Sequence, residues 1–457
     1  MHSDIDAHWQ AIADRAVEDL ATLLRFDTTN PPGNEGPAIE WLASRLRDHG
    51  IEPTILSSSG RPNLVARIRG DGTGGGPLLL AGHVDVVPVE RENWTHDPFG
   101  GEVHDGYLYG RGAVDMKHMV VHCLTAFLLI KRSGITPRRD VIFAAVSDEE
   151  EGCTHGSRFL VEQHPELVRA EYMLGEFGGF SHDVNGVRYY MLQAAERGVC
   201  QFRLTAHGEP GHGSVPHHQN AVVRLGEALA KLGTRRLPPH ICETVRISNA
   251  EMAAHQKPPA RWILPRVLNP ALTHFVLDRV LPDRGLANSL AAQLGNTVSP
   301  TMLEAGVKAN VIPGTATAVL DGRLVPGQTA ADLLREVHDL IGPGFDTEVI
   351  RTFEGREEPV RDPLFELMRE TILRHDPEGV PVPYLLPGFT DGQYFGRLGA
   401  RCYGFAPVRF PKADGVVFAK LVHGHDERIH VEGYRWGLRC FWDLVARFVG
   451  VGEAPPR

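Results

Sequence analysis

The chain has 457 residues and a mass of 50.3 kDa, which exceeds the size at which one hydrophobic core stops growing, so two domains are expected. Hydrophobic residues make up 42% and charged residues 23% of the sequence, as in ordinary folded proteins rather than disordered or membrane-embedded ones. A net charge of −10 and a pI near 6.1 oppose binding to a phosphate backbone and exclude nucleic acid as the main partner.

The N-terminal stretch predicts a cytoplasmic protein. MHSDIDAHWQAIADRAVEDL is acidic and amphipathic, and it lacks the basic start and unbroken apolar segment of a secretory signal. The longest apolar runs are too short to cross a bilayer, so no membrane partner is expected. The cysteines are scattered without CxxC spacing, which favours buried free thiols over a zinc knuckle or a disulfide framework. They are Cys123, Cys153, Cys200, Cys242, Cys402 and Cys440.

Helices and short apolar strands alternate in the N-terminal part of the chain. Apolar periodicity predicts helices over residues 8–24 and 36–49, separated by the loop DTTNPPGNEG. The runs NLVARI, LLLAG and DVIFAAVS are short, rich in β-branched residues and bounded by Gly, Pro or charge, which is typical of strands. The alternation predicts an α/β fold, which places its chemistry in loops beyond the carboxyl ends of the strands.

The pattern changes at about residue 198. A strand, a helix, two strands, a helix and a strand are expected at residues 198–207, 220–233, 296–308, 315–324, 330–341 and 345–353. This order is typical of a compact two-layer α+β domain. Residues 235–296 are longer than a tight connection needs and form an insertion of unknown role. The α/β pattern then returns with helices near 363–375 and 434–449. We therefore expect one domain built from 1–197 and 354–457, interrupted by a second at 198–353.

A histidine and an aspartate in LLLAGHVDVVP form the first candidate site. His83 and Asp85 are two residues apart on an expected strand, so their side chains project to the same side. A carboxylate that holds the second ring nitrogen of a metal-bound histidine fixes its tautomer and strengthens it as a ligand. The alternative interpretation of this pair alone is a structural hydrogen bond.

Carboxylates follow the next apolar segments. Asp115 ends the Gly-rich loop of GRGAVDMK, where it can bridge two cations with its two oxygens or simply cap the following helix. DVIFAAVSDEEEG carries four adjacent acidic residues whose repulsion a divalent cation would relieve, although solvated surface charge is the alternative. Successive side chains point in different directions there, so Glu149 and Glu150 can divide metal binding and proton transfer.

Two further segments complete the candidate set. Glu176 follows the apolar strand of EYMLGEFGG, and the glycines around it leave room for close approach. In LVHGHDERI either His423 or His425 can be a ligand, and spacing does not rank them. Oxygen-rich ligation with one imidazole per ion and one shared carboxylate suits two divalent cations such as zinc, with manganese or cobalt as alternatives.

Five motifs together resemble a known family. In order and spacing, HVDVVP, GRGAVDMK, DEEEG, GEFGG and HGHDERI are similar to the co-catalytic metallopeptidases that include aminoacylases, glutamate carboxypeptidase, acetylornithine deacetylase and succinyl-diaminopimelate desuccinylase. The resemblance covers nearly the whole chain and implies Glu149 as the general base. It implies two metal ions, one held by His83, Asp115 and Glu176 and the other by Asp115, Glu150 and His423.

The same resemblance implies a fold and a dimer. The fold is α/β, with a three-layer catalytic domain around a central mixed sheet and an inserted two-layer α+β lid or dimerisation domain. In HGEPGHGSVPH, His212 matches a histidine that reaches into the partner subunit's site and stabilises an oxyanion. Asn310 and Arg323 match residues that bind the substrate carboxylate, and Gly388 matches a backbone contact to substrate. A homodimer formed through the lid domain is therefore expected.

The chain departs from the family pattern at a few positions. Asp426 stands where family members usually carry Asn, and His118 with Met119 follow DMK where they usually carry Gly. The implied activity is hydrolysis of the amide bond of an N-acyl amino acid or short peptide with a free carboxylate, by a metal-bridging hydroxide. The alternatives are an N-carbamoyl-amino-acid amidohydrolase and a metal-free binding relative without catalysis.

Overall fold

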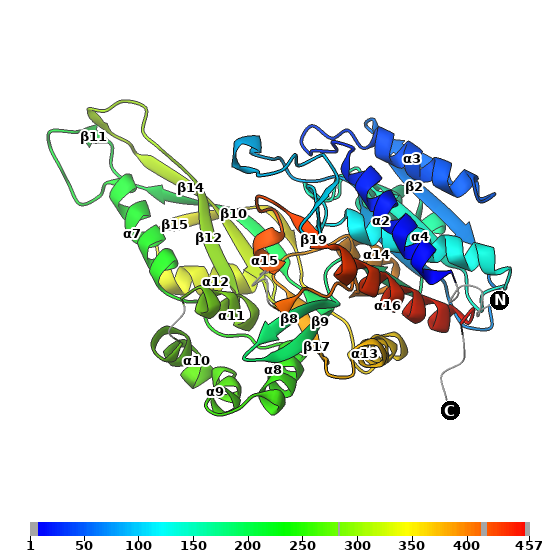
Figure 1. Cartoon of the computed structure of the whole chain (residues 1–457). Coiled ribbons are helices and arrows are strands. Elements are labelled where there is room, and N and C mark those ends of the chain that lie inside the picture. Colours follow the sequence, from blue (N-terminus) through cyan, green and yellow to red (C-terminus); the bar gives the residue numbers. More distant parts are fainter. Residues whose placement is uncertain (1–7, 282–283, 413–417, 453–457) are drawn as a thin grey trace. The chain divides into compact units, whose positions relative to one another are not determined.

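The structure, a computed structural model, describes residues 8–281, 284–412 and 418–452. The chain divides into two compact units. The first combines Met1–Ala194, Glu358–Pro383 and Thr390–Arg457, and the second combines Ala195–Glu357 with Tyr384–Phe389. Figure 1 colours most of the second unit from green to yellow, between the blue and red ends of the first.

A mixed sheet forms the centre of the first unit. Its strands lie in the order β1 (Thr54–Ser58), β2 (Arg61–Ile68), β6 (Val141–Val146), β3 (Leu78–His83), β7 (Tyr172–Gly175), β18 (Arg401–Gly404) and β9 (Val187–Glu196). Strand β3 runs parallel to β6 and β7, and β18 runs parallel to β7, whereas β2 is antiparallel to β6. The mixed α/β fold predicted from the sequence is confirmed, with β2, β3 and β6 at the predicted runs.

Helices cover this sheet through their apolar faces. They include α2 (Trp9–Leu24), α3 (Gly36–Arg47), α4 (Lys117–Ser133), α13 (Pro363–His375) and α16 (Val431–Val449). Helix α4 is buried along nearly its whole length, because it packs on β3 and β6 and also touches α2 and α16. It ends where Gly134 adopts a left-handed φ of 65°, a conformation that glycine accepts without strain.

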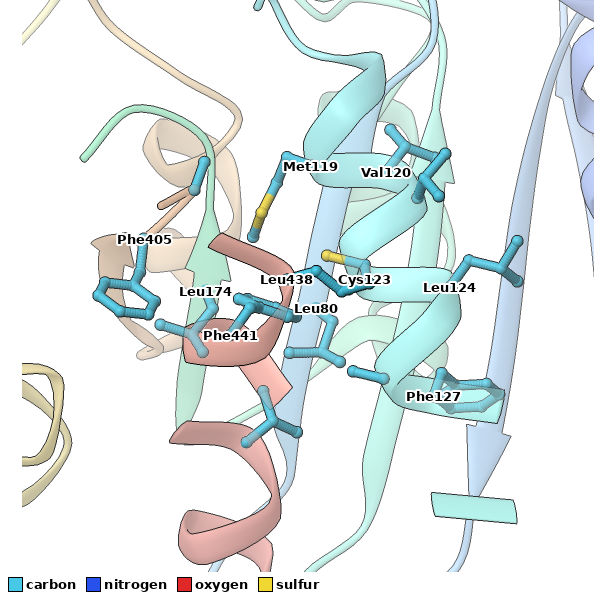
Figure 2. Packing of buried hydrophobic residues seen from close by; sticks show 14 of the residues in the cluster. Leu80, Met119, Val120, Cys123, Leu124, Phe127, Leu174, Phe405, Leu438 and Phe441 are labelled. Carbon is cyan, nitrogen blue, oxygen red and sulfur yellow. The ribbon is translucent and has the colours of Figure 1, made fainter. Parts of the chain in front are cut away.

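Side chains of α4 fill the space between the sheet and α16. Figure 2 shows Met119 and Cys123 on α4 directed toward Leu80 of β3 and Leu438 of α16, with Phe127 further along the same helix and in the same buried cluster. All five side chains are buried, and each large apolar one contributes roughly 1.5–3 kcal/mol by leaving water. The helix that follows the Asp115 loop is therefore rigidly attached to the strand that carries His83.

Shorter elements complete the first unit. Strands β19 (Arg428–His430), β5 (Tyr107–Tyr109) and β4 (Glu102–His104) form a small separate sheet. Strand β8 (Phe180–Val184) pairs with β9, as does β17 (Val380–Leu386). The short helices are α5 (Ser157–Gln163), α6 (Pro165–Val168), α14 (Gly392–Phe395) and α15 (Phe418–Leu421), with 3₁₀ turns at Arg91–Asn93 and Gly396–Leu398.

The second unit has an antiparallel sheet of its own. The strand order is β12 (Thr297–Ala305), β14 (Thr315–Leu324), β10 (Gly198–His207) and β15 (Phe345–Phe353). Burial alternates along β14, so one face of the sheet is apolar, and helices α7 (Ala221–Thr234) and α12 (Ala330–Ile341) pack on it. Two short strands, β11 (Gly211–His212) and β13 (Val311–Ile312), pair beyond this sheet, and β16 (Arg356–Glu357) pairs with the end of β9.

A helical segment occupies the predicted insertion. It consists of α8 (Glu243–His255), α9 (Ala260–Val267), α10 (Pro270–Phe275), the π-helical turn η2 (Val276–Val280) and α11 (Arg284–Leu294). Val245, Val267 and Leu277 of these helices belong to a small apolar cluster that also includes Ala195, Val325 and Leu385. Among the residues that the structure describes, none of the helices is long and apolar enough to cross a membrane.

The second unit spans 195–357, a few residues more at each end than the predicted 198–353, and includes one further segment. Residues 384–389 were expected to belong with 354–457, but they group with the inserted unit. The reason is a pair of backbone hydrogen bonds: the N–H of Arg197 donates to the carbonyl oxygens of Leu386 at 3.2 Å and Gly388 at 3.0 Å. Gly388 therefore lies in the same unit as His212, Asn310 and Arg323.

Candidate metal centre

The predicted metal ligands of the first unit gather at one edge of its sheet. Strands β3, β6 and β7 are parallel, so their carboxyl ends meet there. His83 is the last residue of β3, Glu149 and Glu150 follow β6, and Glu176 follows β7 directly. Asp115 comes from the loop before α4, and its side chain caps no helix, because the N-cap of α4 is Met116.

One group of possible ligands surrounds His83. Its ring Nε2 lies 3.2 Å from Oδ1 of Asp115 and 3.4 Å from Oε2 of Glu176. All three residues are buried, and their ligand atoms lie within 4.8 Å of one another. Gly404 of the neighbouring strand allows Glu176 this position, since a Cβ on Gly404 would lie 2.2 Å from the carbonyl oxygen of Glu176.

A second group shares Asp115 with the first. Nε2 of His423 lies 3.1 Å from Oδ2 of Asp115 and 3.2 Å from Oε2 of Glu150. Because Oδ1 of the same carboxylate faces His83, the two oxygens of Asp115 face two different imidazoles. His425 points elsewhere: its Nε2 is 3.7 Å from Glu90, and it belongs to neither group.

The donor set fits divalent cations. Both carboxylate oxygens of Glu176 and Oε1 of Glu150 are buried and make no hydrogen bond within the described part of the chain. A buried carboxylate oxygen without a donor is unfavourable unless a cation or water satisfies it. Carboxylates and imidazoles are the ligands that borderline dications bind, and each group offers three of them. The residues therefore fit two metal ions.

The charges of the cluster perturb every titrating group in it. Burial lowers the pKa of His83, but the charge of Glu176 and the hydrogen bond to Asp115 outweigh burial and raise it well above the ordinary value. Hydrogen bonds to Asp115 and Glu150 raise the pKa of His423 to about 10. Burial and the charge of Glu176 raise the pKa of Glu149 well above its ordinary value. Without metal, the cluster thus holds protons that dications would displace.

Asp85 supports the cluster mainly through backbone groups. Nδ1 of His83 is 3.0 Å from the carbonyl oxygen of Asp85 and 3.5 Å from its carboxylate. The strand that was expected to carry both residues ends at His83, so Asp85 lies two residues beyond it. The two carboxylate oxygens accept the N–H groups of Glu149 and Glu150, each at 3.1 Å. Asn30 donates to the same carboxylate at 2.9 Å. Asp85 therefore orients His83 and also holds the turn that carries both glutamates.

Glu427 is a second supporting carboxylate, and sequence reasoning did not single it out. It is fully buried, its Oε1 accepts the N–H of Val114 at 2.7 Å and of Asp115 at 3.0 Å, and its Oε2 accepts the N–H of Gly112 at 3.0 Å. The guanidinium of Arg111 donates to Oε2 at 2.7 Å. One side chain thus fixes the loop of Asp115 from the segment that carries His423. The sequence signal that could have identified Glu427 was its position in the motif HGHDERI.

One departure from the family pattern, Asp426, has a local explanation, and the other two residues are buried. Asp426 adopts a left-handed φ of 53°, which Asn and Asp tolerate better than most residues, and it accepts the N–H of Thr95 at 2.7 Å. His118 and Met119 are buried on α4, where burial lowers the pKa of His118 to about 4. Asp391 is buried in the first unit, and burial raises its pKa to about 6.

His212 and Asn310 lie together in the second unit. His212 in β11 is paired with Val311 in β13, and the N–H of Gly213 donates to the carbonyl oxygen of Asn310 at 2.9 Å. The side chain of His212 is exposed, and the N–H of Ser214 donates to its Nδ1 at 3.2 Å. With Nδ1 acting as an acceptor, the neutral ring carries its proton on Nε2.

Arg323 lies at the other end of the same sheet. It is next to the last residue of β14, opposite Val199, whereas the β11–β13 pair adjoins the beginning of β14. Eight residues of strand separate these ends, a distance of roughly 27 Å at the usual rise of a strand. Arg323 pairs with Asp321 at 3.1 Å, and its carbonyl accepts from buried Arg197, whose N–H also reaches Gly388. Arg323 and Gly388 thus both contact Arg197, whereas His212 lies at the other end of the sheet.

A comparison with known protein families supports the interpretation of the cluster as a metal site. Residues 79–447 match the profile of Peptidase family M20/M25/M40. The chain belongs to this family. It is therefore a metal-dependent hydrolase of amide or peptide bonds, and the family and reaction class predicted from the motifs are confirmed.

Related proteins match along most of the chain. N-fatty-acyl-amino acid synthase/hydrolase PM20D1 of Xenopus tropicalis is 30% identical over 428 residues, which cover 89% of this chain and 81% of the relative. Aminoacylase-1 of Sus scrofa is 27% identical over 446 residues, 94% of this chain and 95% of the relative. The M20 family metallo-carboxypeptidase Sso-CP2 from Sulfolobus solfataricus has a TM-score of 0.67 at 17% identity, covering 95% and 99% of the two chains, and shares the fold.

Proposed function

We propose that this M20 hydrolase cleaves the amide bond of N-acyl amino acids or short peptides that carry a free carboxylate. The observation that carries the proposal is Asp115, whose two oxygens face His83 and His423 at 3.2 and 3.1 Å. A carboxylate that belongs to both ligand groups would allow two co-catalytic cations to be held side by side. The two relatives named above, an aminoacylase and an N-fatty-acyl-amino acid synthase/hydrolase, support N-acyl amino acids as the substrate class.

The proposal assigns three ligands to each cation and shares one of them. His83, Asp115 and Glu176 hold one cation, and Asp115, Glu150 and His423 hold the other. Zinc is the preferred ion because it accepts mixed nitrogen and oxygen ligation, and cobalt and manganese are the alternatives. When bound, the cations would polarise the substrate carbonyl and lower the pKa of a bridging water.

Glu149 is the proposed general base. Its Oε2 lies 4.0 Å from Nε2 of His83, so the carboxylate borders the cluster without belonging to either ligand group. Burial raises its pKa, which suits a group that must first accept a proton from water and then release it to the leaving nitrogen. Asp85 holds the backbone N–H of Glu149 and so keeps this carboxylate beside the cluster.

The second unit is assigned as the lid and dimerisation domain, close to the predicted limits of 198–353. His212 would donate its Nε2 proton to the developing oxyanion, while Asn310, Arg323 and the backbone of Gly388 would bind the substrate carboxylate. His212 and Arg323 stand at opposite ends of β14, so one copy cannot bring both to one small substrate. A homodimer that supplies His212 from the partner copy satisfies this constraint.

Exposed apolar residues on an edge strand are compatible with a dimer. Strand β12 is at the edge of its sheet, and Met302 and Leu303 on it are 66% and 67% exposed. An exposed edge strand with apolar side chains is a template on which another chain can pair. We further propose a cytoplasmic location, which is supported by six cysteines that are all buried and free.

A substrate panel tests the proposed function. The purified chain, loaded in turn with zinc, cobalt or manganese, is assayed on N-acyl amino acids, dipeptides, their C-terminally amidated forms and N-carbamoyl amino acids. We expect chelator-sensitive hydrolysis of the first two classes and at least tenfold lower kcat/KM for the amidated forms, since a lost charged hydrogen bond costs about 1.5–3 kcal/mol. Equal rates with amidated substrates, or ammonia release from carbamoyl compounds alone, would contradict the proposal.

A further inference from the structure

Two exposed aromatic side chains lie on neighbouring helices of the insertion. Trp262 on α9 is 60% exposed and Phe275 on α10 is 59% exposed, and no other Trp or Phe in the described part of the chain has an exposed side chain. Helix α9 packs against α10, and Figure 1 shows the two beside each other in the second unit. Leaving two large rings in water is unfavourable, so this position calls for an explanation.

Arginines accompany both aromatic residues. Arg261 and Arg266 are exposed on α9 on either side of Trp262, and Arg279 is exposed in the π-helical turn η2, which follows α10 directly, four residues after Phe275. None of the three arginines forms an ion pair with a described acidic residue. Leu272, which is 38% exposed, lies three residues before Phe275 on the same face. We call the exposed residues of these adjoining elements, α9, α10 and η2, the arginine–aromatic face: Arg261, Trp262, Arg266, Leu272, Phe275 and Arg279.

The charge of the insertion is opposite to that of the whole chain. Residues 235–296 contain eight Lys or Arg and four Asp or Glu, a net charge of +4 in a protein whose net charge is −10. Asp278, the acidic residue closest in sequence to Phe275, is bound by Arg236 at 2.9 Å. The positive charge of this face is thus left for a partner outside the chain.

We propose that the arginine–aromatic face docks this hydrolase on the surface of an anionic lipid bilayer. A helix that presents aromatic and aliphatic side chains together with arginines lies in the headgroup region, where the rings enter the acyl boundary and the guanidinium groups meet phosphate and carboxylate groups. Each basic residue near such a surface strengthens binding severalfold. The sequence excluded a membrane-spanning helix, whereas peripheral docking depends on which side chains the fold exposes.

Other binding partners fit the arginine–aromatic face less well. A second copy of the same face would bring six arginines together around four aromatic rings, with no acidic residue in the face to balance them. A nucleic acid would meet the positive face, but the −10 charge of the chain opposes a long polyanion, and Leu272 would contribute nothing to a phosphate contact. An anionic bilayer uses both the charge and the apolar side chains.

Vesicle binding by the full chain tests the proposal. The protein is sedimented with phosphatidylcholine vesicles and with vesicles that contain about 30% phosphatidylserine, at low and at physiological salt. We expect binding to the anionic vesicles alone and weaker binding at higher salt, because headgroup attraction is screened. The double variants W262S/F275S and R261E/R266E should each bind at least about tenfold more weakly.

Controls separate docking from folding and from catalysis. Leu373→Ser with Val103→Ser removes two exposed apolar side chains of the first unit, and this variant should bind vesicles like the parent. Metal content and hydrolysis of a water-soluble N-acetyl amino acid should be unchanged in all variants, so these readouts test the proposed function separately. Failure of the parent chain to bind anionic vesicles at low salt would overturn the docking proposal, as would an equal loss of vesicle binding in the control variant.

Discussion

Glu427 accepts the backbone N–H of Asp115 at 3.0 Å, although the two residues are more than 300 positions apart in the chain. Glu427→Gln should weaken metal binding roughly 10–100-fold, as loss of residues that orient ligands commonly does. The reason is that the new amide NH₂ would face backbone N–H donors, so the loop of Asp115 would lose its fixed position. Chelator competition with zinc or cobalt measures the change.

The matched control is Glu432→Gln, a charge-removing change at an exposed residue of α16. It should leave metal affinity unchanged. The absorption spectrum of the cobalt-loaded protein adds a readout that general destabilisation would not move, because it reports ligand geometry. An unaltered cobalt spectrum and unaltered affinity in Glu427→Gln would show that Glu427 does not position the bridging carboxylate.

Glu149→Gln should abolish turnover while both metal ions stay bound. The substitution removes the proposed proton carrier and keeps the size of the side chain, so we expect kcat to fall by about three orders of magnitude or more. Elemental analysis and steady-state kinetics of the same preparation measure both quantities. Glu151→Gln is the control, since Glu151 is the exposed neighbour in the same acidic run. Near-normal turnover in Glu149→Gln would contradict the assignment of Glu149 as the general base.

His212→Ala should reduce activity and leave metal content unchanged, because His212 is in the second unit and the ligands are in the first. We expect a loss of about 10²–10³-fold in kcat, the usual effect of removing one oxyanion donor. His218→Ala, at an exposed histidine six residues after His212, should leave activity unchanged. Mixing the His212 variant with a metal-deficient His83→Ala variant should restore part of the activity. No recovery in mixed dimers would argue against action across the interface.

Removing the metals should make stability depend on pH. In the metal-free protein, burial and the charge of Asp115 raise the pKa of Glu150 to about 7 and that of Glu176 to about 8. Both values exceed the ordinary 4.5, so this contribution to stability is present below pH 4.5 and is lost as pH rises through 7 and 8. His423, whose pKa is raised to about 10 by hydrogen bonds to Asp115 and Glu150, makes a contribution to stability that is also lost as pH rises.

Bound cations stabilise the ionised carboxylates, so the metal-loaded protein does not lose this stability as pH rises. The difference in Tm between the metal-loaded and chelated protein should therefore grow as pH rises from about 5 to about 9. Differential scanning fluorimetry with and without chelator measures it. A difference that shrinks over this range would contradict the assignment of Glu150 and Glu176 as ligands.

The ligand set could be anticipated from sequence because each member follows a recognisable local signal. His83 and Glu176 come at the ends of short apolar strands, and parallel strands bring such ends to one edge of a sheet. Asp115 ends a Gly-rich loop before a long apolar helix. Such signals are local, so they can be read without knowing which distant segments meet.

Supporting groups could not be predicted, because their partners are backbone atoms. Asp85 was expected to hold the ring of His83, but nothing in the sequence predicted that its carboxylate also accepts the N–H groups of Glu149 and Glu150. Glu427 satisfies the N–H groups of a loop that only tertiary folding brings near. The insertion was marked only by its length, since short helices such as α9 lack a long periodic pattern.

The position of Arg323 and His212 at opposite ends of β14 has a consequence for how activity scales. If each substrate needs one residue from each copy, the isolated chain has no complete site, and the specific activity should decline when the enzyme is diluted below the dissociation constant of its dimer. Enzyme concentration would then enter the rate law with an exponent above one in that range.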